Sequence, residues 1–200
     1  ARQKGYTGKG VTIAVIDGPV DTSNPALKGT NITDKSRCTI QDSPEGIRHG
    51  TDMAIILVSP ISGVAPDATL YNYQASSDGT ISEGSCDSNG DRLDTTAALI
   101  NQAVEDGAQI ISISLSVPDF SNELKWAVTN AITKGVIIVA AAGNEGHQDN
   151  TTQLGRYSGV VGVSAINSDG TFASYSNWAD GMVTAAFGGP YNTYNVTTGA

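Results

Sequence analysis

Short apolar runs alternate along the chain with longer stretches in which apolar residues recur at helical spacing. The apolar runs predict strands at 10–17, 68–74, 108–116, 135–142, 159–166 and 182–187. The stretches of helical spacing predict helices at 49–58, 94–106 and 121–134. Strands that alternate with helices are typical of parallel sheets covered on both faces, so the pattern predicts an α/β fold with a mostly parallel central sheet.

Two of these helices are flanked by residues that favour helix ends. Asp94 or Thr95 precedes "AALINQAVEDG", and Ser121 precedes "NELKWAVTNAITKG". The side chains of these residue types accept hydrogen bonds from the first free N–H groups of a helix. Gly107 and Gly135 follow the last helical residues, a position that favours glycine. We therefore expect both helices to begin and end at these residues.

Composition narrows the classes of function. The chain has 200 residues, of which 39% are hydrophobic, and this suits one domain with a sizeable core. Twenty acidic residues against eleven basic ones give a net charge of −9, which argues against nucleic acid as a partner. The longest apolar run, "VIIVAAAG", is far shorter than the roughly 20 residues that span a membrane, so we expect no membrane span. The N-terminal "ARQKGYTGKG" lacks the apolar core of an export signal, so we expect any such signal to have been removed or to lie outside this sequence.

Three polar residues stand at strand ends or at a helix start, where function collects in α/β sheets. Asp17 ends "VTIAVID", and a carboxylate there needs a partner if it is buried. His49 lies where a polar loop gives way to an apolar helix, and Asn144 follows the strand in "VIIVAAAGNEG". Each also has an ordinary structural explanation, as a turn-capping Asp, a structural His and an Asn in a left-handed turn.

In this order, the three residues belong to sequence blocks of a known family. "GKGVTIAVIDGPVDTSNPAL" is similar to its Asp block, "RHGTDMA" to its His block, "GVAPDATLYNYQ" to the strand after the His helix, and "VAAAGNEG" to its oxyanion-hole Asn block. The chain thus resembles the subtilisin-like serine proteases, the subtilases, from Gly8 onward. The resemblance implies a three-layer subtilisin-like α/β fold and peptide-bond hydrolysis by an Asp-His-Ser triad.

The resemblance gives each of the three residues a catalytic role. Asp17 would accept a hydrogen bond from Nδ1 of His49, and His49 would act as general base and then as general acid. Asn144 would donate its side-chain amide to the oxyanion of the tetrahedral intermediate. The other histidine, His147, lies in the loop "NEGHQDN", and we expect it to be solvated.

The sequence stops short of the nucleophile that this chemistry needs. In the family, the serine follows a Gly and a small residue, and the final "TTGA" has that form, so we expect the serine directly after Ala200. An alternative is that Ala200 replaces the serine, but the pattern would then place Gly where the chain has Thr198. The required context is missing at the other candidate serines, Ser158, Ser164, Ser168, Ser174 and Ser176.

We therefore interpret residues 1–200 as a single subtilase catalytic domain that lacks the C-terminal part with the serine. The chain alone is expected to be inactive. The missing part would leave apolar surface uncovered, which is unfavourable in water. We expect a second polypeptide that carries the remainder of the domain to cover this surface.

The resemblance also implies how a peptide or protein substrate binds. The substrate would add as a strand beside 114–118 and beside the acidic loop 76–91. Ser116 and Val117 replace a Gly-Gly pair that is usual in the family, which predicts a narrower specificity pocket. The expected substrate-binding residues are Ser114, Leu115, Ser116, Ala142, Gly143 and Glu145. A preference for basic residues is a hypothesis that rests on the nearby carboxylates of Asp78, Glu83, Asp87, Asp91, Asp94 and Glu145.

Cys38 and Cys86 both lie in polar, loop-like stretches. That placement favours a surface disulfide, with two unpaired thiols as the alternative. We expect neither a metal nor a cofactor: the family's calcium-binding Asp is replaced by Ala26, and the loop "ILVSPISGVAP" is too short for the family's calcium-binding insertion. The acidic loop 82–94 has enough oxygen atoms for calcium, but the sequence favours a solvated surface loop over a calcium site.

Two functions from different classes fit these residues. The first is a secreted or cell-surface serine endopeptidase, in which "IDGPVD" and the loop cysteines resemble processing-type members such as the mycosins and the cyanobactin proteases. The second is a non-catalytic module of subtilase fold that binds a peptide or a partner. A serine encoded directly after Ala200 would favour the enzyme, and a stop codon there would favour the module.

Overall fold

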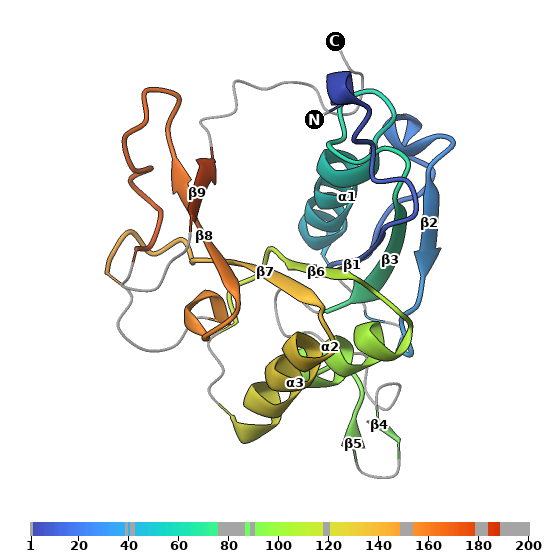
Figure 1. The fold of residues 1–200 in the computed structure, drawn as a ribbon, viewed down its shortest axis with the longest axis vertical. Helices are drawn as coiled ribbons and strands as arrows, with labels where there is room; N and C mark the ends of the chain where they lie inside the picture. The colour runs from blue at the N-terminus through green and yellow to red at the C-terminus, as the bar shows by residue number, and fades with distance from the viewer. Residues whose placement is uncertain are drawn as a thin grey trace.

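The central feature of the fold is a seven-stranded sheet in the order β2-β3-β1-β6-β7-β8-β9. The computed structural model describes residues 2–38, 40, 43–75, 87–88, 91–117, 121–148, 154–178 and 184–188. All neighbouring strands of the sheet are parallel (Figure 1). The strands are β1 (Thr12–Asp17), β2 (Asn31–Asp34), β3 (Thr69–Gln74), β6 (Ile110–Ile113), β7 (Ile137–Ala141), β8 (Val161–Ile166) and β9 (Thr184–Phe187).

The predicted strands all form, each within its predicted range. The edge strand β2 is an addition that the hydrophobic pattern does not predict, because its sequence "NITD" is polar and mostly exposed. It forms by pairing with β3, in a register that places Asn31 opposite Thr69. A separate antiparallel pair consists of β4 (Asp87–Ser88) and β5 (Asp91–Arg92).

The helices also follow the predictions, with one displaced start. They are α1 (Pro44–Val58), α2 (Thr96–Glu105) and α3 (Asn122–Thr133), with short 3-10 helices at Arg2–Lys4, Pro25–Leu27 and Leu154–Arg156. Ser121 caps α3, and of the two candidates for α2 it is Thr95 whose side chain accepts from a backbone N–H, that of Ala98. Gly107 and Gly135 follow α2 and α3 with φ angles of 84° and 78°.

Helix α1 begins earlier than predicted because its cap lies in the preceding polar loop. Ser43 accepts a hydrogen bond from the Gly46 N–H at 3.0 Å, and Pro44 occupies the first helical position. Proline is favoured there, since its missing N–H would have no partner within the helix. His49 therefore lies in the second turn of α1 and not at its start.

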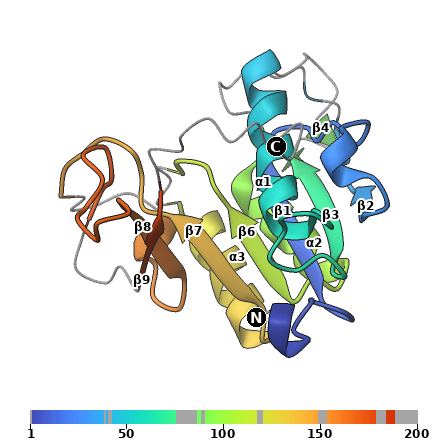
Figure 2. The same ribbon diagram turned by 90° about the horizontal axis from the view of Figure 1, so that it is seen from above.

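The helices form two outer layers on opposite faces of the sheet (Figures 1 and 2). Alternate residues of β1 pack into two different hydrophobic clusters, one on each face of the sheet. Ile13 and Val15 pack in one hydrophobic cluster with Ala54, Ile55 and Val58 of α1. Ala14 and Ile16 belong to a larger cluster that includes α2 and α3. Successive side chains of a strand point to opposite faces, so the central strands are apolar on both. The predicted three-layer α/β fold is confirmed.

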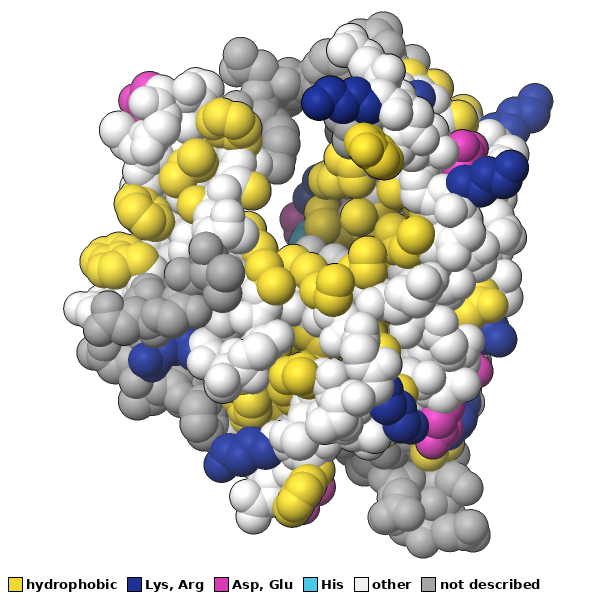
Figure 3. Space-filling view, viewed as in Figure 1, with side chains coloured by type: hydrophobic (Ala, Val, Ile, Leu, Met, Phe, Trp, Pro, Cys, Tyr) yellow, Lys and Arg dark blue, Asp and Glu magenta, His cyan; other side chains and the backbone are white. Residues whose placement is uncertain are grey.

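The end of the sheet formed by β8 and β9 is less covered than the centre. All residues of β9 are exposed, and the Phe187 side chain is 68% exposed. On the same side of the sheet, α1 stands over β1 and β3 (Figure 1). A hollow therefore separates α1 from β8 and β9, and hydrophobic side chains line much of it (Figure 3).

Candidate active site

Asp17 and His49 form a hydrogen-bonded pair at the carboxyl end of β1. Asp17 is the last residue of the strand and is fully buried. Nδ1 of His49 lies 2.7 Å from Oδ1 of Asp17, and the Gly18 N–H donates to the same oxygen at 2.7 Å. An ionised carboxylate only accepts hydrogen bonds, so Nδ1 carries the proton and Nε2 is left as a base.

This contact also changes the acidity of the imidazole. The hydrogen bond to Asp17 raises the pKa of His49 above its usual 6.5, against the opposing effect of burial. The Asp17 charge and the nearby Asp52 carboxylate raise the pKa further, and the Arg48 guanidinium lowers it. The pair therefore stabilises the imidazolium that forms when His49 takes up a proton.

Gly50 and Thr51 explain why α1 lies close enough to β1 for this pair. A Cβ atom on Gly50 would lie 2.4 Å from the Gly18 carbonyl oxygen, so only glycine allows the helix to approach the loop after β1. Oγ1 of Thr51 donates to the Ile47 carbonyl at 2.7 Å and accepts from the Asp21 N–H at 2.9 Å. Together the two residues hold the helix that carries His49 against the loop that follows Asp17.

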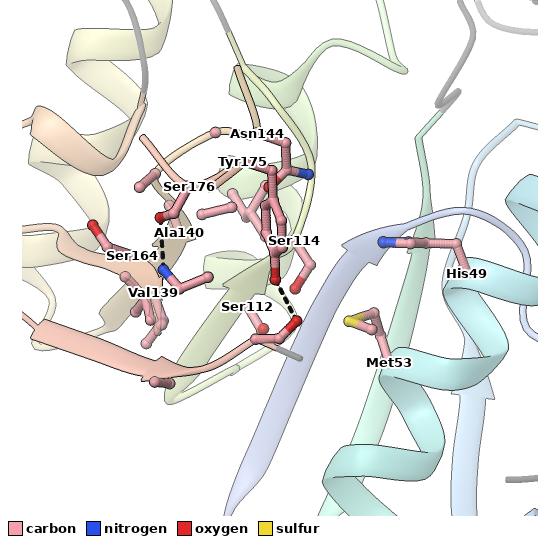
Figure 4. A pocket seen from close by; sticks show the side chains of 18 of the residues that line it. His49, Met53, Ser112, Ser114, Val139, Ala140, Asn144, Ser164, Tyr175 and Ser176 are labelled. Atoms are coloured by element: carbon pink, nitrogen blue, oxygen red, sulfur yellow. Dashed lines mark hydrogen bonds between the residues drawn. The ribbon is translucent and has the colours of Figure 1, made fainter. Parts of the chain in front are cut away.

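Asn144 lies on the opposite side of the hollow, in the turn after β7. The strand ends at Ala141, and Gly143 has a φ angle of 104°, in the left-handed region. The exposed Asn144 follows directly. In Figure 4, His49 points from α1 toward the wall that carries Asn144, Ser114 and Tyr175.

His49 and Asn144 both line one cavity of about 530 Å³. One wall comes from α1, and the other comes from the ends of β6, β7, β8 and β9. The lining residues are Arg48, His49, Asp52, Met53, Ser112, Ile113, Ser114, Val139, Ala140, Ala141, Ala142, Gly143, Asn144, Val163, Ser164, Ala165, Tyr175, Ser176, Ala186, Phe187 and Gly188. The arrangement brings the hydrogen-bonded pair of His49 and Asp17 and the side chain of Asn144 to one cavity with apolar and polar lining residues.

Comparison with known proteins identifies the family of this chain. The family model described as "Subtilase family" matches residues 8–197. The chain belongs to the subtilase family. Among curated relatives, it is 31% identical to subtilisin E of Bacillus subtilis (strain 168) over 98% of this chain and 53% of that protein. It is 34% identical to the major intracellular serine protease of the same strain, over 87% of this chain and 56% of that protein.

A solved structure with similar fold is that of the patellamide maturation protease PatA. Its TM-score is 0.69 at 27% identity, and the match covers 87% of this chain and 63% of that chain. The predicted resemblance to subtilases, with processing-type members among them, is confirmed. The subtilase chain spans about half the length of the curated subtilisins that it matches first.

The predicted substrate-binding residues of this subtilase lie in two environments. Ser114, Ala142 and Gly143 line the cavity. Leu115 packs against the main hydrophobic cluster, and Ser116 is exposed next to it in the chain. The carboxylate of Glu145 accepts a hydrogen bond from the buried Asn177. Leu115, Ser116 and Glu145 are therefore not among the cavity-lining residues in the described part of the chain.

Several predictions fall outside the residues that the structure describes. These are the position of Ala200 beside His49, the side chains of Asp78 and Glu83, and the pairing of Cys38 with Cys86, of which Cys38 alone is described, as a buried residue. In the described ranges, no cluster of His, Cys, Asp or Glu is arranged to hold a metal ion. The described helices include none that is long and apolar enough to cross a membrane.

The structure adds residues to the site that sequence reasoning missed. Asp52 and Met53 follow His49 by three and four positions in α1, so they share its face of the helix and line the cavity. That spacing was a signal available in "RHGTDMA". Tyr175 also lines the cavity, and its sequence context gave no signal. Ser164 and Ser176, considered from the sequence only as nucleophiles and set aside, line the cavity as well.

Proposed function

We propose that this chain supplies the acid-base pair and the oxyanion donor of a serine endopeptidase. The observation that carries the proposal is the 2.7 Å contact between His49 and the buried Asp17, at a cavity that Asn144 also lines. The proposed nucleophile is a serine directly after Ala200. Membership of the subtilase family supports the reaction class.

In the proposed mechanism, the serine hydroxyl attacks the carbonyl carbon of a peptide bond while Nε2 of His49 takes its proton. Asp17 keeps His49 in the tautomer that is protonated at Nδ1, and it stabilises the imidazolium that His49 becomes. Asn144 and a backbone N–H donate to the oxyanion that forms on the carbonyl oxygen. The imidazolium then protonates the leaving amine. In the second half of the reaction, water attacks the acyl carbon while His49 takes its proton. The bond to the serine oxygen then breaks, and the His49 imidazolium returns the proton to that oxygen.

We also propose that residues 1–200 form a single catalytic domain completed by a further segment. The hollow between α1 and β8–β9 is lined largely by apolar side chains, which favour an apolar element over bulk water. The segment that follows Ala200, on the same chain or on a second polypeptide, is the proposed occupant. Binding of this segment in the hollow would place the serine near His49.

The remaining parts of the proposal concern location and substrate. The substrate is a peptide or protein, bound as a strand beside residues 114–118. A secreted or cell-surface location with a Cys38–Cys86 disulfide is proposed. Thiol titration of the unfolded, unreduced protein tests the disulfide: no free thiol is expected, and two free thiols would exclude it.

The test of catalysis uses the full-length gene product. Wild-type protein should cleave peptides and react with a fluorophosphonate, which labels activated serines. His49→Ala should abolish both reactions while the protein stays folded, because the proposed role of His49 is proton transfer and its side chain is 41% exposed. His147→Ala is the matched control and should retain activity. If His147→Ala is as inactive as His49→Ala, the assignment of the base is wrong.

A further inference from the structure

The loop that carries Asn144 is attached to one buried amide from a neighbouring segment. Asn177 is 1% exposed. Its Oδ1 accepts from the backbone N–H of Glu145 at 3.1 Å and from that of His147 at 3.3 Å. Its Nδ2 donates to the Glu145 carboxylate. One side chain thus holds the backbone and a side chain immediately after Asn144.

The orientation of the Asn177 amide follows from its partners. Two backbone N–H groups can only donate, so the amide oxygen faces them, and the amide nitrogen then faces the carboxylate of Glu145. All three contacts are satisfied only in this orientation. A reversed amide would turn its NH₂ group toward the two backbone N–H groups and leave donors facing each other, which is unfavourable.

Backbone contacts hold the same loop from both of its ends. The Asn177 N–H donates to the Gly143 carbonyl at 3.1 Å, and the Trp178 N–H donates to the His147 carbonyl at 3.3 Å. A Cβ atom on Gly143 would lie 2.4 Å from Nδ2 of Asn177, so this approach requires glycine. Asn144 therefore sits between two residues, Gly143 and Glu145, that Asn177 contacts.

Asn177 is itself held against the sheet. The hydroxyl groups of Ser164, in β8, and of Ser176 each donate to the Asn177 carbonyl at 3.0 Å. The hydrogen bonds run from β8 through Asn177 to the turn after β7. Ser164 and Ser176 line the cavity, whereas Asn177 is not among the lining residues in the described part of the chain.

We propose that Asn177 is a positioning residue that orients the Asn144 amide toward the cavity. The inference rests on the proposed endopeptidase function and deepens it, since it names what aligns the oxyanion donor. A donor that is displaced by about 1 Å can cost roughly 10²-fold in rate. Because Asn144 is proposed to act on the oxyanion, the loss should fall on kcat and not on KM.

The experiment changes the charge and the hydrogen-bond donors in the contact between Asn177 and Glu145, in the full-length protein. Asn177→Asp keeps an acceptor for the two N–H groups but places a carboxylate against that of Glu145, so repulsion should move the loop. We expect kcat for a quenched-fluorescent peptide, selected for wild-type cleavage, to fall roughly 10²-fold with KM changed less than about threefold. In Asn177→Asp/Glu145→Gln, the new amide can donate to the new carboxylate. This double variant should return to within a few-fold of Glu145→Gln alone.

Asn130→Asp is the matched control. Its amide donates to Asn101 at 3.1 Å between α3 and α2, away from the cavity, so kcat should not change. The positioning role is overturned if Asn177→Asp lowers the melting temperature but leaves kcat unchanged, or if Glu145→Gln brings no recovery. Should Asn177→Asp fail to fold, Asn177→Ser replaces it and must show the loss in kcat. A wild-type protein that cleaves no peptide overturns the proposed function, and this inference with it.

Discussion

Adding one methyl group at Gly50 should separate the two residues of the proposed acid-base pair. In Gly50→Ala, the new Cβ would meet the Gly18 carbonyl oxygen at 2.4 Å, whereas ordinary contacts begin at 3.4 Å, so α1 and the loop after β1 must separate by about 1 Å. The Nδ1 atom of His49 and Oδ1 of Asp17 are now 2.7 Å apart. A separation of that size takes them beyond hydrogen-bonding distance.

Two magnitudes follow from this displacement. Misplacement of a catalytic group by about 1 Å can cost roughly 10²-fold in turnover. Overpacking of a close contact costs about 1–3 kcal/mol of folding free energy. We therefore expect Gly50→Ala to lose about two orders of magnitude in kcat/KM while a folded population remains.

The assay compares kcat/KM, the melting temperature and the low-field proton resonance of the His49 Nδ1–H in the full-length protein. Gly155→Ala is the matched control, because its nearest neighbour would lie at 3.1 Å and a shift of a few tenths of an ångström accommodates it. If Gly50→Ala keeps the low-field resonance and its kcat/KM stays within about threefold of wild type, the close approach of α1 does not hold the pair, and the reasoning is refuted.

Further predictions concern charge, hydrogen bonding and the core. The raised pKa of His49 should place the acidic limb of the kcat/KM profile above pH 6.5, and Asp52→Asn should move that limb to lower pH, as a pH–rate profile would show. Because the pKa of His49 is higher in the folded protein than in the unfolded chain, protonation of His49 stabilises the fold. This stabilisation is fully present below pH 6.5 and is lost as the pH rises through the pKa of His49 in the folded protein. Unfolding in urea at several pH values measures it. Thr51→Val removes two hydrogen bonds near the pair and should cost about 1–3 kcal/mol in urea unfolding; an unchanged midpoint would contradict their role. Leu124→Ala, at a fully buried position, should cost about 2–5 kcal/mol, whereas Trp126→Ala, at a 73% exposed position of the same helix, should cost far less.

The sequence predicted those parts of the fold that depend on local pattern. The six apolar strands carry their own signal, because burial on both faces requires nearly continuous apolar residues. The strand β2 could not be found in this way, since a polar edge strand is defined by its partner β3 and not by its own residues. The start of α1 depends on the Ser43 cap, which lies outside the apolar pattern of the helix.

The same distinction applies to the candidate site. Asp17, His49 and Asn144 could be named because each stands in a recognisable block, although their mutual distances could not. Asn177 could not be named, because its importance comes from hydrogen bonds to residues about thirty positions earlier, at Glu145 and His147. Contacts of that separation are a property of the folded chain.

The order of strands in the sheet determines the distance between the strand end that carries Asp17 and the strand end that precedes Asn144. Asp17 ends β1 and Asn144 follows β7, and in the sheet β6 lies between these two strands. Neighbouring strands are about 4.8 Å apart, so the two strand ends are separated by about 10 Å. Backbone hydrogen bonds maintain that spacing independently of any side chain. Surface loops around this sheet can therefore differ in length and sequence while the distance between these two strand ends stays the same.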